Sequence, residues 1–318
     1  MKTTTAAGLS RKQMRALVWS IALAIGGYLA VSMWSGWREV IGAASRIGLT
    51  GITIALILSL INYGLRFVRW HYYLGLLGHP VPVASNLRIY LTGFALTTTP
   101  GKAGEMIRSV FLAPLGVSYS KSLAAFFSER LSDLIAVLAI AMIGIASYPQ
   151  GRPVFYFLVA SAMAVLFTIH RHSWLNRIKH YIDDKFSGRA RNAVVGLVDI
   201  ALHSRQLYRW TPLFSGLLLG FIAWWAEAYA FHLMIGWMGL QIPLSVAVFI
   251  YAFSMIIGAV SFLPGGLGGV EVAMVALLVL NRVPAAEAVA LTILIRITTL
   301  WFAVVIGLGV LLRYRRHP

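Results

Sequence analysis

The chain contains no cysteine, which excludes disulfide bonds, thiol catalysis and cysteine-ligated metal sites. Acidic residues are also scarce, with ten Asp and Glu against 27 Lys and Arg in 318 residues. The four charged types together make up 12% of the chain, whereas a soluble domain carries about twice that fraction. Because 59% of the residues are hydrophobic, the sequence predicts an all-α integral membrane protein.

Enzyme signatures are missing as well. The sequence has no Walker A loop, no HExxH pair and no GxSxG elbow, and its histidines have no metal-ligand spacing beside an acid. We therefore expect no catalysis, no cofactor and no bound metal. The formal charge of +17 does not indicate nucleic acid as a partner, because most Lys and Arg flank hydrophobic runs. At such positions they set membrane topology and attract lipid headgroups.

Hydrophobic runs of spanning length predict about six full transmembrane helices, at about 15–35, 49–70, 118–147, 153–169, 211–236 and 284–311. The first of these runs is too long for the core of a signal peptide, so we interpret it as a retained span. The segment at about 170–210 alternates basic and apolar residues, which is typical of an amphipathic helix on the cytoplasmic membrane surface. The whole chain, 1–318, is predicted to be a single polytopic membrane domain.

Two further hydrophobic segments are interrupted by Pro-Gly breaks. Their pieces are about 84–99 and 102–114 around Pro100-Gly101, and about 244–262 and 268–281 around Pro264-Gly265-Gly266. Each piece is shorter than the roughly 20 residues that a crossing helix needs. Irregular backbone at membrane depth is tolerated where protein or a cavity surrounds it. The sequence therefore predicts two re-entrant helical hairpins.

The two broken segments belong to a sequence repeat. Glu105 and Glu271 follow the breaks at a separation of 166 positions, and Arg130 and Arg296 have the same separation. We place repeat 1 at about 84–147 and repeat 2 at about 244–311. Counting the crossings together with the positive-inside rule puts both termini in the cytoplasm and the hairpins on opposite faces. This is an inverted-topology repeat, an arrangement that transporters use to build a site at mid-membrane.

Charged residues inside the hydrophobic segments are the candidate site residues, because a charge at the bilayer centre costs roughly 2.5–3.5 kcal/mol on insertion scales. Arg130 and Arg296 are predicted to hold a phosphate together, since guanidinium groups bind phosphate bidentately. Backbone N–H groups after the breaks and two extra cations of repeat 1 would add affinity for an anion. The predicted substrate-binding residues are therefore Arg130, Arg296, Lys102, Arg108, Gly101, Gly104, Gly265 and Gly266.

The acidic residues of these segments are predicted to balance charge or to carry coupling protons; they are Glu105, Glu129, Asp133, Glu271 and Glu227. The alternative for each acid is an ion pair that only holds the broken helices together. Three arginines beside aromatic residues or near the expected end of a span are interpreted as interfacial anchors, with direct binding of substrate as the alternative; they are Arg66, Arg69 and Arg88.

Taken together, these motifs resemble the lysylphosphatidylglycerol synthase transmembrane family. The resemblance covers about 10–312 and is carried by Arg69-Trp70, by Pro100 to Glu105 with Arg108, by Glu129 to Leu134, by Leu263 to Glu271, and by Arg296. It implies a bacterial or archaeal inner (cytoplasmic) membrane protein linked to the movement of lipid between leaflets. In the multiple peptide resistance factor of this family, that lipid is an aminoacylated phosphatidylglycerol. The present sequence lacks the soluble aminoacyl-transfer domain, so we expect that it does not make this lipid.

The function expected from the residues and the resemblance is translocation of an anionic, phosphate-containing lipid. Its partner would be a membrane phospholipid or a polyprenyl-phosphate lipid, and a homo-oligomer is left open. Two alternatives stand beside this reading. One is an intramembrane enzyme, or enzyme partner, that acts on a polyprenyl-linked sugar. The other is a lipid-binding scaffold for another complex.

Overall fold

The computed structural model describes residues 26, 37–99, 103–171, 175, 177, 180–182, 185 and 188–314. The predicted first span lies outside this range except for Gly26, as do Gly101 and Lys102 at the first break and part of the predicted amphipathic segment. All regular elements of the described residues are helices, so the predicted all-α class is confirmed.

The long and short helices alternate along the chain. Their bounds are α2 Trp37–Leu76, α3 Val83–Phe94, α4 Ile107–Leu112, α5 Tyr119–Met142, α6 Arg152–His170, α8 Gly188–Ser204, α9 Trp210–Trp237, α10 Leu244–Val260, α11 Gly269–Leu280, α12 Ala285–Arg296 and α13 Phe302–Tyr314. A 3₁₀ turn, Ala103–Met106, precedes α4, and another, Arg205–Tyr208, joins α8 to α9. A π-helical turn, Ile297–Trp301, joins α12 to α13, so that these two helices form one continuous rod.

Four of the described segments are long and apolar enough to cross a membrane: Trp37–Leu76, Arg152–Ile169, Trp210–Trp237 and Ala285–Arg313. Helix α5 has 24 residues, about 36 Å, which is also sufficient, although it carries four charged side chains. Helix α2 is kinked at Gly48, whose φ of +69° is not helical, and the straight part after it matches the span predicted from about 49. The number of six spans stays a prediction.

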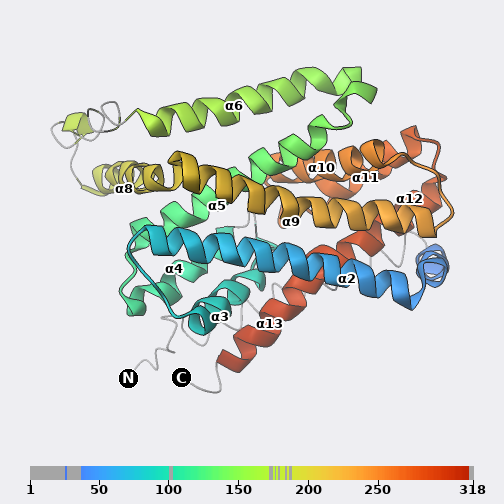
Figure 1. The fold of residues 1–318 in the computed structure, drawn as a ribbon, viewed down its shortest axis with the longest axis horizontal. Helices are drawn as coiled ribbons and strands as arrows, with labels where there is room; N and C mark the ends of the chain where they lie inside the picture. Colours follow the sequence, from blue (N-terminus) through green and yellow to red (C-terminus); the bar gives the residue numbers. More distant parts are fainter. Residues whose placement is uncertain are drawn as a thin grey trace.

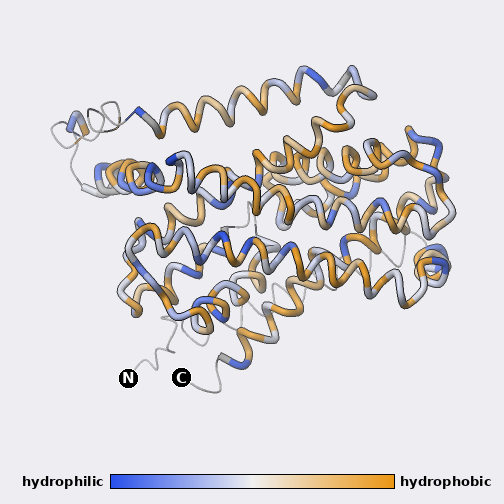
Figure 2. The backbone as a smooth tube through the Cα atoms, viewed as in Figure 1, coloured by the Kyte–Doolittle hydropathy of each residue, from blue (hydrophilic) through white to orange (hydrophobic). Residues whose placement is uncertain are grey.

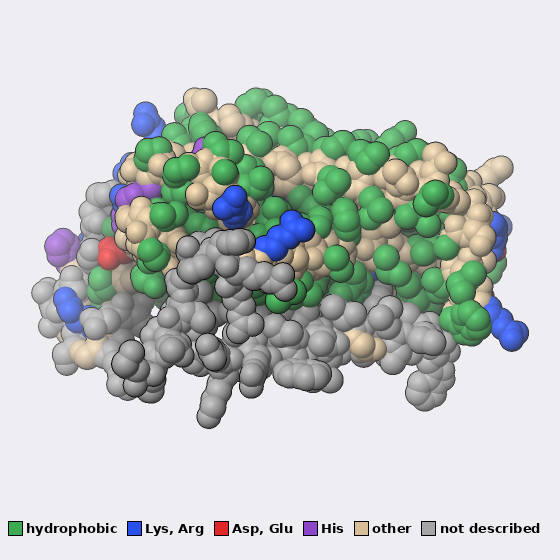
Figure 3. All heavy atoms as spheres, turned by 90° about the horizontal axis from the view of Figure 1, so that it is seen from below, with side chains coloured by type: hydrophobic (Ala, Val, Ile, Leu, Met, Phe, Trp, Pro, Cys, Tyr) green, Lys and Arg blue, Asp and Glu red, His purple; other side chains and the backbone are tan. Residues whose placement is uncertain are grey.

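The outer surface is largely apolar (Figures 2 and 3). On the face in Figure 3, hydrophobic side chains cover the middle, and most of the Lys and Arg side chains lie toward the two ends of the long axis. Helix α6 lies at the edge of the bundle (Figure 1) and exposes Tyr156, Phe157, Met163 and Phe167 by 60% or more. Large exposed apolar side chains of this kind are expected where lipid is the solvent.

The order of helices repeats along the chain. The series α2, α3, α4, α5 is followed by α9, α10, α11 and the α12–α13 rod at an offset of about 166 residues, with α6 and α8 between them. In Figure 1, α3 and α4 lie toward one end of the long axis, whereas α10, α11 and α12 lie toward the other end. With 12 and 17 residues, α3 and α10 are both too short to cross the hydrocarbon core alone.

The two breaks meet inside the bundle. The backbone N–H of Gly265 donates to the Thr99 carbonyl over 3.5 Å, and a Cβ added at Gly265 would lie 3.2 Å from the Cα of Thr98. Gly265, Gly266 and Gly268 all have φ between +62° and +87°, a region that side chains other than glycine rarely occupy. The glycines therefore permit both the sharp turn and the close approach of the two backbones.

The rod of α12 and α13 contacts both breaks. Gly307 packs so closely on the first break that an added Cβ would clash with the backbone nitrogen of Ala95, at 2.2 Å. Near its middle, the π-helical turn leaves the Thr299 carbonyl to accept a hydrogen bond from the Tyr63 hydroxyl of α2. One helix thus connects the two hairpins and α2.

Candidate functional site

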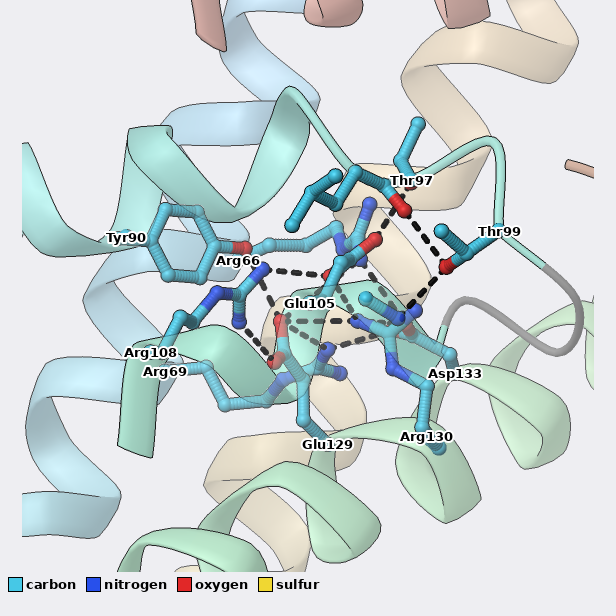
Figure 4. A network of polar contacts seen from close by, with 12 residues as sticks. Arg66, Arg69, Tyr90, Thr97, Thr99, Glu105, Arg108, Glu129, Arg130 and Asp133 are labelled. Atoms are coloured by element: carbon cyan, nitrogen blue, oxygen red, sulfur yellow. Dashed lines mark hydrogen bonds and ion pairs between the residues drawn. The ribbon is translucent and has the colours of Figure 1, made fainter. Parts of the chain in front are cut away.

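Four arginines and three acids meet where α2, α5 and the first hairpin pack together (Figure 4). We call this group the arginine cluster; its members are Arg66 and Arg69 from α2, Glu105 and Arg108 from the first hairpin, and Glu129, Arg130 and Asp133 from α5. Arg66 lies ten residues before the end of α2, and Arg130 lies eleven residues after the start of α5. Both are therefore about 15–17 Å from these ends of their helices.

Arg69 is held by Asp133. Its Nη2 atom donates to Oδ1 of Asp133 over 2.5 Å, and the side chain of Arg69 is fully buried. Helix α9 leaves room for this guanidinium, because a Cβ at Gly220 would lie 2.6 Å from its Nη1 atom. A glycine at this position thus lets a charged side chain pack between three helices.

Arg108 ties the first hairpin to α5. It donates from Nη2 to Oε2 of Glu105 over 2.6 Å and from Nη1 to Oε2 of Glu129 over 3.0 Å. Its guanidinium lies 4.1 Å from the centre of the Tyr90 ring, a cation–π geometry. The Thr97 hydroxyl donates to Oε1 of Glu105 over 2.5 Å, and the Tyr90 hydroxyl donates to Oε1 of Glu129 over 3.0 Å. Arg108 therefore links the first hairpin to α5, and both of its terminal nitrogens, Nη1 and Nη2, already donate to carboxylates.

Arg66 and Arg130 are bound less tightly. The Nη2 atom of Arg130 lies 3.4–3.6 Å from Glu129, Glu105 and Asp133, and that of Arg66 lies 3.4 Å from Asp133 and 3.7 Å from Glu129. Contacts this long are ion pairs without good hydrogen bonds.

Among the described residues, the Nε and Nη2 atoms of both arginines have no hydrogen-bond partner, and neither has Oδ2 of Asp133 between them. The side chain of Arg130 is 20% exposed, whereas the other cluster side chains are at most 8% exposed. Nε and Nη1 of Arg69 and Nε of Arg108 also lack acceptors among the described residues. Arg66 and Arg130 differ because neither has a carboxylate within 3.0 Å, whereas Arg69 and Arg108 do. Buried donors without acceptors are rare and costly.

Arg296 has a different environment. It donates from Nε to Oε1 of Glu271 over 2.7 Å and from Nη2 to the Gly265 carbonyl over 2.9 Å. Glu271 in turn accepts from the backbone N–H of Gly268 over 2.7 Å. The structure therefore places Arg130 and Arg296 each at its own hairpin, and Arg296 serves to fix the second break. A shared phosphate between Arg130 and Arg296 would require Arg296 to leave these partners.

Three predicted backbone donors are engaged, two within their own loop and one between the two breaks. The N–H of Gly104 donates to Oγ1 of Thr99 over 2.6 Å, that of Gly265 to the Thr99 carbonyl over 3.5 Å, and that of Gly266 to the Leu263 carbonyl over 2.9 Å. Gly101 and Lys102 lie outside the described residues. The described part of the breaks thus uses its N–H groups to hold its own conformation.

Glu227 lies on α9 outside the arginine cluster. It is buried and accepts a hydrogen bond from the Tyr251 hydroxyl over 2.6 Å. Within the described residues, no group of three His, Asp or Glu side chains is arranged to hold a metal ion.

The interpretation of Arg66 and Arg69 as interfacial anchors is wrong, because they are only 5% and 0% exposed. The span does not end at Trp70; α2 continues to Leu76 through an aromatic and apolar stretch, which carries the arginines into the bundle. A signal was present in the sequence, since Arg66 and Arg69 share one helix face and the acids of α5 need cations. Arg88, by contrast, is exposed on α3.

The chain is similar to archaeal membrane proteins along most of its length. A UPF0104 membrane protein of Methanothermobacter thermautotrophicus is 24% identical over 306 residues, which is 90% of either chain. The UPF0104 membrane protein PH1989 of Pyrococcus horikoshii is 24% identical and covers 91% of this chain and 94% of its own length. The membrane protein MJ1078 of Methanocaldococcus jannaschii is 24% identical over 221 residues.

Residues 17–307 match the family described as the lysylphosphatidylglycerol synthase TM region. This range includes both breaks, the arginine cluster and the Glu271–Arg296 pair, so the motifs that suggested the resemblance all lie within the match. The chain belongs to the lysylphosphatidylglycerol synthase transmembrane region family.

Proposed function

We propose that this membrane protein moves an anionic, phosphate-containing lipid between the two leaflets, with the headgroup bound between Arg66 and Arg130. The observation that carries the proposal is that Arg66 and Arg130 have no carboxylate closer than 3.4 Å, while their buried Nε and Nη2 atoms lack acceptors among the described residues. In a low-dielectric site, a phosphate oxygen is a strong acceptor for such donors. The partial exposure of Arg130 gives the headgroup its access.

The lipid would be a phospholipid or a polyprenyl phosphate, because only the phosphate is recognised while the acyl or prenyl tails remain in the membrane. Arg69, Arg108 and their carboxylate partners hold the frame around the site. Arg66 and Arg130 replace the pair of Arg130 and Arg296 as the proposed phosphate ligands, since Arg296 is occupied by Glu271 and Gly265.

The meeting of the two breaks supports a barrier at the centre of the path. Hairpins that enter from opposite faces would meet at their tips, as Thr99 and Gly265 do. Their hydrogen bond is 3.5 Å long and therefore weak, so breaking it to separate the tips would cost little. The protein would act without catalysis in the cytoplasmic membrane, with both termini on the cytoplasmic side. The energy source would be an ion gradient or the lipid gradient itself.

The test is lipid translocation by the purified protein in liposomes, with fluorescent phosphatidylglycerol as the probe and chemical quenching of the outer leaflet as the readout. Arg130→Gln should slow translocation at least about tenfold, because it removes the accessible cation of the site. Arg88→Gln is the matched control, since it removes an exposed arginine from the same hairpin and should leave the rate unchanged. Undiminished translocation by Arg130→Gln would refute the proposal. A covalently altered lipid would favour the intramembrane enzyme instead.

A further inference from the structure

The arginine cluster is not electrically balanced. Its four arginines stay protonated in any protein environment. Each of its three carboxylates lies within 3.5 Å of at least one guanidinium and within 4 Å of a second, so all three are ionised. Among the described residues, the cluster therefore carries one positive charge more than it can neutralise. An uncompensated charge at this depth is costly, which favours a ligand that cancels it.

The excess charge is located at Arg66 and Arg130. Arg69 and Arg108 make hydrogen bonds of 2.5–3.0 Å with Asp133, Glu105 and Glu129. Arg66 and Arg130 make only contacts of 3.4 Å or more. Nε and Nη1 of Arg69 and Nε of Arg108 also lack acceptors among the described residues, but each of these two groups has a carboxylate at hydrogen-bond distance. The cation without such a carboxylate is thus shared between Arg66 and Arg130.

Asp133 lies between the two open guanidinium groups. Its Oδ2 atom is 3.4 Å from Arg66 and 3.6 Å from Arg130, and it accepts no hydrogen bond from the described residues. Both oxygens of Glu129, in contrast, are already hydrogen-bonded, to Tyr90 and Arg108. Asp133 is therefore the acid that competes with a bound phosphate for the same two cations.

We infer that the site selects a headgroup with a single negative charge, a phosphodiester, and that Asp133 sets this limit. The inference rests on the proposed function and specifies its substrate. A phosphodiester brings the described cluster to neutrality. A phosphomonoester dianion or a diphosphate would leave excess negative charge against Asp133, and a neutral headgroup would leave Arg130 unpaired. Asp133 is thus a specificity-determining residue for the lipid.

The experiment compares two lipids whose charges differ in a controlled way. Binding of phosphatidylglycerol and phosphatidic acid to the full chain is measured in mild detergent by native mass spectrometry at pH 5 and pH 9. The second ionisation of a phosphate monoester lies near about pH 6, so phosphatidic acid changes from one charge to two between these conditions. Phosphatidylglycerol keeps one charge and reports any change in the protein itself.

The wild type should bind both lipids similarly at pH 5 and should bind phosphatidic acid about tenfold more weakly than phosphatidylglycerol at pH 9. Equal binding of the two lipids at pH 9 would overturn the charge limit and leave the proposed function standing. Binding of neither lipid at either pH would contradict the proposed function as well. This comparison uses only the wild-type protein, so its result does not depend on whether a variant folds.

Variants test the role of Asp133. Asp133→Asn raises the excess to two charges and should reverse the preference at pH 9 in favour of phosphatidic acid. Adding Arg69→Gln to that variant returns the excess to one and should restore the preference for phosphatidylglycerol. Glu287→Gln removes an acid from the surface pair with Arg46 and should change neither preference. An unchanged preference in a folded Asp133→Asn protein would assign Asp133 a structural role only.

Discussion

The two repeats have the same arrangement of helices and opposite chemistry. In each, a glutamate in the first turns after the Pro-Gly break faces an arginine in the following long helix. In repeat 2, Glu271 and Arg296 are 2.7 Å apart and hydrogen-bonded. In repeat 1, Glu105 and Arg130 are 3.5 Å apart and make no hydrogen bond. The equivalent Glu–Arg pair is thus hydrogen-bonded in repeat 2 and is only a loose ion pair in repeat 1.

Position 108 explains the difference. Arg108 takes Oε2 of Glu105 and thereby leaves Arg130 without a tight partner. The equivalent position of repeat 2 is Met274, which is buried and cannot compete for Glu271. The same arrangement of helices therefore holds a hydrogen-bonded Glu–Arg pair in one half and, in the other, a loose pair that forms part of the proposed phosphate site.

The other charged positions follow the same division. The counterparts of Arg66, Arg69, Glu129 and Asp133 at an offset of 166 residues are His232, Ile235, Ile295 and Thr299. At the equivalents of the seven positions of the arginine cluster, only Glu271 and Arg296 are Asp, Glu, Lys or Arg. Because burial of charge is expensive, this concentration in one half favours function over stability as its cause.

Breaking the hydrogen-bonded pair of repeat 2 should have the largest effect. Arg296→Met leaves Glu271 and the Gly265 carbonyl without their partner, so the free energy of unfolding should fall by about 3 kcal/mol. Denaturant unfolding in micelles measures this. Arg46→Met breaks an exposed Arg–Glu pair between α2 and α12 and should cost less than about 1 kcal/mol. Equal losses for the two variants would show that the second break does not depend on Arg296.

Arg108→Met makes repeat 1 resemble repeat 2 and sharpens the comparison. Without Arg108, Glu105 is free to pair with Arg130, and the described cluster becomes neutral with three arginines and three acids. Translocation of phosphatidylglycerol in liposomes should fall at least about tenfold, because Arg130 gains a close carboxylate and the described cluster has no excess charge. Arg108→Lys keeps the charge and should retain a measurable part of the rate. Full activity of Arg108→Met would disprove the explanation based on position 108.

The smallest effect is expected in the loops, where the repeats also differ. In repeat 1, Lys121 lies 3.1 Å from Nε2 of His79, and burial together with this cation lowers the pKa of His79. The equivalent of Lys121 in repeat 2 is Glu287, which pairs with Arg46.

Since the pKa of His79 is lower in the folded state than in the unfolded state, the unfolded chain binds the proton more readily as the pH falls below about 6.5. Stability should therefore decrease on acidification through that range. His79→Gln should reduce the slope of melting temperature against pH between about 7.5 and 5.5. An unchanged slope would exclude His79 as a source of the pH dependence.

Features that depend on local sequence were predictable. The helical class follows from hydropathy, and the positions of the breaks follow from Pro100, Pro264 and their glycines, because these residues cannot continue a helix. Family membership was also recoverable, since the motifs retain their spacing over most of the chain.

Features that depend on packing between distant segments were not predictable. Arg66 and Arg69 looked like anchors because nothing local shows that α2 continues into a bundle beside Asp133. The link that Arg108 makes between the first hairpin and α5 depends on Glu129, which lies 21 residues away on another helix. The glycine N–H groups seemed available because only the folded loops show their partners, such as Oγ1 of Thr99.

The π-helical turn at Ile297–Trp301 has a mechanical consequence. Just before this turn, Arg296 donates a hydrogen bond to the Gly265 carbonyl of the second break. After it, Gly307 packs against the backbone of Ala95, at the end of α3 next to the first break. Such a turn is a weak point within an otherwise stiff rod, and here it is tied to α2 through Tyr63. A displacement of this rod would therefore reach both hairpins at once, so the two breaks are mechanically coupled through a single helix.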